Sequence, residues 1–186
     1  MVAKSPRKSS ARSEPAGARR LAIALAALVA VLVIGTLGDP GITSDEPLDV
    51  RPGRTYVHEW LANGWGFFRP EVVERVFADN AEHPPLGRWL LGVAAFVGEP
   101  FEPFLGGTDP FSVHAGRLAP ALAFAALVAI VVLNMAGRRS LSAGAGAGLA
   151  LLLMPRVFAH AHLAALDTFL CLFWTAALLA AARALQ

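Results

Sequence analysis

Two neighbouring carboxylates near the start of the sequence have the residue types needed for group transfer. Asp45 and Glu46 stand eight residues after a long apolar stretch that ends at Leu37. A carboxylate in this position can remove a proton from a hydroxyl or amine that lies within hydrogen-bond reach, and so act as a general base. An ordinary acidic loop would have the same spacing, so the pattern alone leaves both interpretations open.

A second polar motif, Glu-His-Pro-Pro-Leu-Gly-Arg, runs from Glu82 to Arg88. Its two prolines favour an extended approach to a helix that begins near Leu86, and this explains them without any function. Glu82 and Arg88 add charges at the head of that helix. His83 is the residue that local structure explains least.

Arginines and histidines in the second half could meet an anionic ligand. Arg117 and Arg156 border apolar stretches, and a guanidinium group offers a fork of donors that matches phosphate oxygens. Snorkelling to lipid head groups is the ordinary alternative. His160, His162 and Asp167 are metal-capable, but an i, i+2 pair points to different faces of a helix, so we predict no metal site there. Asp167 is also suited to cap a helix.

These residues must be positioned by membrane helices. The 186 residues are 55% hydrophobic and only 16% charged, whereas soluble domains carry about 25% charged residues. This composition excludes a water-soluble globule and predicts an all-α polytopic membrane protein. The basic residues at the N-terminus form a short tail without a patterned face, which argues against a nucleic-acid partner.

Four apolar segments predict four transmembrane helices, at 21–38, 115–136, 140–158 and 167–184. The first has seventeen uncharged residues from Leu21 to Leu37, more than the core of a typical signal peptide, so we favour an uncleaved helix over a signal peptide. The third is short before Arg156, and its Gly-Ala repeat is suited to close helix packing.

Charge sets the expected orientation. Residues 1–20, which we expect to be disordered, hold six basic groups and one acid. By the positive-inside rule this tail is cytoplasmic. The segment 39–114, with twelve acids and five arginines, then lies on the non-cytoplasmic face. It is expected to contain interfacial helices at about 70–78 and 86–97. We therefore expect a multi-pass protein of the cell inner (plasma) membrane.

Taken in order, the motifs resemble the N-terminal portion of a GT-C-fold glycosyltransferase, of the family 39-like type that includes protein O-mannosyltransferases and lipid A aminoarabinose transferases. The resemblance covers about residues 20–183. It rests on Asp45-Glu46 after the first span, on Glu82 to Arg88 before an interfacial helix, on Arg117 at the second span and on Leu166-Asp167 before the fourth. In mannosyltransferases the second motif resembles His-Pro-Pro-Leu-Gly-Lys, so Arg88 is a departure that keeps the charge.

The resemblance implies a partial GT-C fold and transfer of a sugar from a polyprenyl-phosphate carrier, within the membrane lipid, to a protein or glycolipid acceptor. It implies that Asp45 is the base or orients the acceptor. Glu46 and Glu82 would support the acceptor or sugar, and Arg117 with Arg88 or Arg156 would stabilise the phosphate. The site residues expected on these grounds are Asp45 and Glu46 for catalysis, and Glu82, His83, Arg88, Arg117, Arg156 and Asp167 for substrate binding.

Several alternatives stay open: the sugar, the acceptor, the oligomeric state and a dependence on divalent metal. Family members have more spans and a later outer domain, so we expect these 186 residues to be an N-terminal fragment that lacks transferase activity alone. The competing interpretation is a non-catalytic component, such as a transporter fragment or scaffold. An ion relay would need ionisable groups at bilayer depth, and the second and fourth predicted spans have none between their ends.

Overall fold

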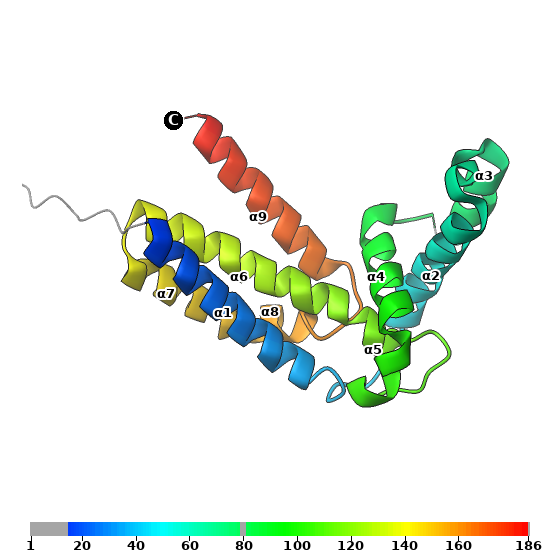
Figure 1. Cartoon of the computed structure of the whole chain (residues 1–186), viewed down its shortest axis with the longest axis horizontal. Helices are drawn as coiled ribbons and strands as arrows, with labels where there is room; N and C mark the ends of the chain where they lie inside the picture. Colours follow the sequence, from blue (N-terminus) through cyan, green and yellow to red (C-terminus); the bar gives the residue numbers. More distant parts are fainter. Residues whose placement is uncertain (1–14, 79–80, 186) are drawn as a thin grey trace, which may run out of the picture.

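All regular structure in the computed structural model, which describes residues 15–78 and 81–185, is helical (Figure 1). Three segments are long and apolar enough to cross a membrane. They comprise most of α1 (Pro15–Gly35), the run Val113–Arg138 that includes α6 (Leu118–Arg138), and α9 (Asp167–Ala184). The expectation of an all-helical chain with several candidate membrane spans is confirmed, but the described residues contain three helices of that length rather than four.

The difference arises in the predicted third span, 140–158. This stretch forms two helices, α7 (Leu141–Leu152) and α8 (Pro155–His160). The twelve residues of α7 extend about 18 Å, too little for a ~30 Å hydrocarbon core. The break follows from Pro155, which has no N–H to continue the helical ladder and favours an extended residue before it. Met154 accordingly has ψ of 105°.

Helices α1, α6 and α7 pack into one bundle with a shared apolar core (Figure 1). The glycines of α7 allow a close approach to α6. A Cβ added at Gly144 would lie 2.7 Å from Ala136 Cβ, and one added at Gly148 would lie 2.7 Å from Val132 Cγ2. The small-residue repeat is therefore a helix contact surface, as its composition predicts.

The two ends of the described chain differ from the sequence-based expectations. Helix α1 begins at Pro15, so Arg19 and Arg20 are helical, while the rest of the predicted disordered tail, residues 1–14, lies outside the described residues. Helix α9 packs against α6 near its start and diverges from it toward the C-terminus (Figure 1). Cys171 stands between Leu170 and Leu172, a position that predicts a small buried residue, but it is exposed on α9.

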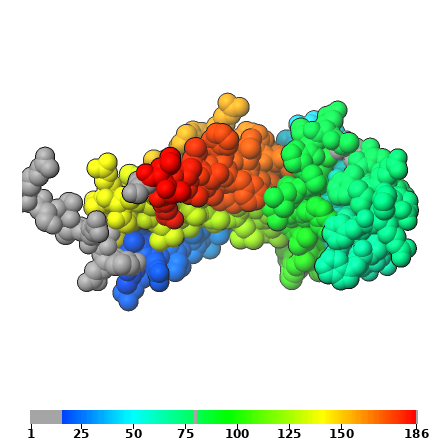
Figure 2. All heavy atoms as spheres, turned by 90° about the horizontal axis from the view of Figure 1, so that it is seen from above, coloured from blue at the N-terminus to red at the C-terminus, as the bar shows by residue number. Residues whose placement is uncertain are grey.

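The segment 39–114 forms a helical lobe at one end of the bundle (Figure 2). Helices α3 (Pro70–Phe77) and α4 (Pro85–Gly98) coincide with the two predicted interfacial helices. The lobe also contains α2 (Asp45–Asn63), α5 (Val113–Gly116) and 3-10 helices at Gly64–Phe68 and Glu99–Leu105. The sequence did not predict α2, because Pro52 interrupts it and its apolar residues follow no helical period.

Helices α2 and α4 cross with their backbones in contact. A Cβ at Gly53 would overlap the carbonyl oxygen of Arg88, and a Cβ at Gly92 would overlap the carbonyl oxygen of Gly53. Beside this crossing, Tyr56, Phe67 and Trp89 form an aromatic cluster with ring centroids 5.4 to 5.7 Å apart for the two pairs that include Trp89. Glycine at both crossing positions thus fixes the distance between the first two motifs of the sequence.

Candidate functional site

A buried ion pair joins the acidic motif of α2 to the start of α6. Arg117 Nε donates to Glu46 Oε1 at 2.7 Å, and Arg117 Nη2 donates to Glu46 Oε2 at 2.8 Å. Both side chains are fully buried. This bidentate geometry is the strong form of an arginine–carboxylate ion pair.

Arg117 also closes the turn that follows α1. Its Nη1 donates to the carbonyl oxygens of Leu37 at 2.6 Å and Pro40 at 3.0 Å, and its Nη2 donates to that of Gly41 at 2.9 Å. With the two bonds to Glu46, these contacts use all five N–H donors of the guanidinium. Arg117 therefore has no donor left for a lipid phosphate in this structure, which differs from the role that the sequence suggested.

Glu46 receives further hydrogen bonds from distant parts of the chain. The backbone N–H of Ala164 donates to Oε1 at 2.7 Å, and the backbone N–H of Thr43 donates to Oε2 at 2.8 Å. Burial raises the pKa of Glu46, but the hydrogen bonds and the charge of Arg117 outweigh it, so the net pKa lies below the ordinary value. Glu46 is thus an ionised junction between four segments, without free access for an acceptor.

A second buried pair links α4 to α2. Arg88 Nε donates to Asp49 Oδ1 at 2.9 Å, with the two side chains only 1% and 11% exposed. Asp49 lies one helical turn after Asp45, so this pair sets how the start of α4 meets the start of α2. Arg88 is consequently buried, and its charge is already matched by a carboxylate.

Three of the expected site residues are exposed near these pairs. Asp45 lies in the first turn of α2, where Ser44 Oγ approaches its Oδ1 at 3.4 Å. Glu82 and His83 lie in the turn before α4. The first turn of α4, which follows them, is adjacent to the segment before α9, because a Cβ on Gly87 would lie 2.6 Å from Leu166 Cδ2.

The remaining expected residues line a pocket of about 170 Å³ between α8 and α9, with Arg156, His160, Asp167 and Thr168 on its walls. His160 Nδ1 lies 3.3 Å from Asp167 Oδ2, which is an ion-pair distance if the ring is protonated. His162 faces elsewhere, since its Nε2 lies 2.8 Å from Thr36 Oγ1. The two histidines therefore take different partners.

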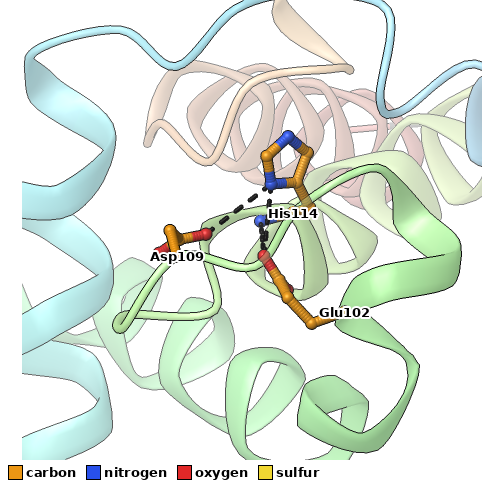
Figure 3. Close-up of side chains that lie close together, drawn as sticks. All are labelled: Glu102, Asp109 and His114. Atoms are coloured by element: carbon orange, nitrogen blue, oxygen red, sulfur yellow. Dashed lines mark hydrogen bonds and ion pairs between the residues drawn. The ribbon is translucent and has the colours of Figure 1, made fainter.

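The structure also contains a polar cluster that the sequence did not suggest, formed by Glu102, Asp109 and His114 (Figure 3). His114 Nδ1 lies 3.1 Å from Glu102 Oε1 and 3.6 Å from Asp109 Oδ2. The carboxylates also accept backbone N–H groups at the start of α5, including that of Ala115 at 2.7 Å and that of Val113 at 2.9 Å.

The two acids of this cluster have opposite pKa shifts. Burial and the neighbouring Asp109 raise the pKa of Glu102 above its ordinary value, against the opposing backbone N–H groups. Burial also acts to raise the pKa of Asp109, but hydrogen bonds from Glu102 and from backbone N–H groups lower it overall. Two carboxyl groups this close disfavour ionisation of both at once, and the shifts put that penalty on Glu102.

The sequence offered little to identify this cluster. Glu102 stands between prolines and phenylalanines, and Asp109 follows a Gly-Gly-Thr stretch, so neither residue lies in a periodic pattern. A His five residues after an Asp was the one available signal. Comparison with models of protein families, with curated proteins and with solved structures found no match.

Proposed function

We propose that this chain is the N-terminal portion of a membrane glycosyltransferase that moves a sugar from a polyprenyl-phosphate carrier to a protein or lipid acceptor. One observation supports this proposal above others: the motifs on which the resemblance rests converge in space. The starts of α2, α4 and α6 and the turn before α9 meet through Glu46, Arg117 and Ala164 and through the contact of Gly87 with Leu166.

In this proposal Asp45 is the base. Its neighbour Glu46 is held rigidly by Arg117, which fixes the first turn of α2 while Asp45 itself stays exposed. A general base must lie within hydrogen-bond reach of the proton that it removes, so a fixed backbone with a free carboxylate suits the role. Glu82 and His83, exposed at the start of α4, would contact the acceptor or the sugar.

The carrier phosphate needs a cation that is free to contact it. Arg88 and Arg117 are buried and paired, so we assign them to positioning α4 and α6 rather than to the phosphate. Arg156 is exposed and lines the pocket that also contains Asp167. It is therefore the phosphate ligand in this proposal, and a guanidinium suits that role.

The proposed reaction balances without a cofactor. The acceptor oxygen or nitrogen forms a bond with the anomeric carbon of the sugar, and the bond from that carbon to the phosphate oxygen breaks. The electron pair leaves with the polyprenyl phosphate, whose charge Arg156 stabilises. Asp45 receives the proton of the acceptor, and its carboxylate is regenerated by transfer to water.

The test compares two aspartates of the same outer segment in the full natural protein, reconstituted with a labelled polyprenyl-phosphate sugar. Asp45→Asn should reduce transfer by at least about 100-fold, the scale of general-base catalysis. Asp39→Asn, also exposed and six residues earlier, should leave transfer unchanged. Both variants should insert normally, which proteoliposome flotation measures.

The outcome also distinguishes the competing class of protein. Transfer that is equal in Asp45→Asn and in the unmodified protein would remove Asp45 from the mechanism. Absence of any transfer with mannose, glucose or aminoarabinose donors, together with ion flux across the same vesicles, would instead favour a transporter component.

A further inference from the structure

The geometry of Glu102, Asp109 and His114 points to a binding site for one divalent cation of the Zn²⁺ type, separate from the proposed transferase site. The three side chains come from a 3-10 helix, a loop and α5, and they converge on one point (Figure 3). Their ligand atoms all lie within 4.8 Å of one another. These are the donor types, one imidazole nitrogen and two carboxylate oxygens, that zinc takes in protein sites.

The separations between these atoms match a tetrahedral ion. Zinc–nitrogen and zinc–oxygen bonds of about 2.0 to 2.1 Å place neighbouring tetrahedral ligands about 3.4 Å apart. His114 Nδ1 lies 3.1 Å from Glu102 Oε1 and 3.6 Å from Asp109 Oδ2. Small side-chain rotations therefore suffice to surround an ion, and a water molecule would complete the tetrahedron.

Charge favours a cation at the same place. The side chains of Glu102 and Asp109 are only 5% and 15% exposed, and two carboxylates close together in a buried site repel each other when ionised. Arg54 bonds to Ser112 in the same loop, but its ion pair is with Glu99. A divalent ion would neutralise both carboxylates of the cluster.

The protein holds the two carboxylates in place. Asp109 Oδ1 accepts the N–H of Phe111 at 2.9 Å, and Glu102 Oε2 accepts that of Ala115 at 2.7 Å. Gly107 lies against the cluster, since a Cβ there would overlap His114 Nδ1 and lie 2.6 Å from Glu102 Oε1. Such outer contacts fix the orientation of metal ligands. The cation would thereby fasten the loop that leads into α5.

The test uses the full chain, purified without a histidine tag, stripped with chelator and then titrated with Zn²⁺ and with Co²⁺. We expect one equivalent of bound zinc by elemental analysis and a visible ligand-field spectrum for cobalt. Asp109→Asn keeps an oxygen for the N–H of Phe111 but loses a charged ligand. It should weaken binding by more than about 100-fold, beyond the effect typical of outer contacts.

Two further variants test whether His114 is a ligand of the ion. His114→Gln should also abolish the cobalt spectrum, while His58→Gln, which changes an exposed histidine on α2, should leave both stoichiometry and spectrum unchanged. Circular dichroism should show equal helicity for all variants. Less than one equivalent of zinc, or equal binding by the unmodified, Asp109→Asn and His114→Gln proteins, would overturn the site.

Discussion

The substitution Glu46→Gln tests how much the buried junction contributes to stability. It keeps the size of the side chain but removes the charge opposite Arg117, whose guanidinium is fully buried. Removing one partner of a buried ion pair costs about 3–5 kcal/mol, because the other charge is left uncompensated. The unfolding equilibrium constant should therefore rise by roughly 10²- to 10⁴-fold.

A matched control uses the same change at Glu59. Arg75 Nη2 lies 2.7 Å from Glu59 Oε2, the same separation as in the buried pair, but the Arg75 side chain is 62% exposed. Exposed pairs contribute about 0–1 kcal/mol, so Glu59→Gln should leave stability nearly unchanged. Because the two ion pairs have the same separation, a difference in stability between the two variants reports the effect of burial.

Two measurements check this prediction in detergent micelles. Reversible unfolding gives the difference in stability between the two variants and the unmodified protein. Hydrogen exchange at the amides of Thr43 and Ala164, which donate to Glu46, reports whether the junction opens locally. Equal stability of Glu46→Gln and Glu59→Gln, with unchanged exchange at both amides, would refute the reasoning.

Three further outcomes are expected. The fold lowers the pKa of Glu46 from its ordinary value of 4.5, so the ionised side chain stabilises the fold above that pH. This stabilisation is lost as the pH falls through the pKa in the fold. Over that range, thermal stability should therefore drop less for Glu46→Gln than for the unmodified protein. Gly92→Ala should lower thermal stability because its Cβ overlaps the facing α2 backbone, whereas Gly146→Ala, with open space around it, should be neutral or slightly stabilising; a destabilised Gly146→Ala would contradict this. In a background without the native cysteine, a thiol reagent outside the cell should label Asp45→Cys and leave Arg139→Cys unlabelled, and the reverse pattern would invert the proposed orientation.

Most of the correct prediction of the fold came from hydropathy and from the positions of prolines. Apolar runs of sufficient length identified the segments of α1, α6 and α9, and Pro70 and Pro85 marked the starts of α3 and α4. Helix α2 was not predicted because its stability comes from tertiary contacts, such as the Gly53–Gly92 crossing, rather than from an apolar stripe. The interruption at Pro155 was visible in the sequence, but its effect on span length was underestimated.

The candidate site was predictable only as a set of residue types. The sequence placed Glu46 and Arg117 in one region, yet their pairing across 71 positions depends on how the helices pack, which no local pattern specifies. Burial then decided their chemistry, since a fully hydrogen-bonded guanidinium cannot also bind a ligand. The sequence did not suggest that Glu102 and His114 lie together, because only the path of the loop between them brings them into contact.

The contacts of Glu46 impose an order on assembly of the chain at the ribosome. Its carboxylate is bonded by Arg117, which is made 71 residues later, and by the amide of Ala164, made 118 residues later. At synthesis rates of about 5–20 residues per second, Glu46 waits about 6 to 24 seconds for its last partner. Arg117 can bond Glu46 first, and synthesis of the turn after α8, which contains Ala164, supplies the last of these partners.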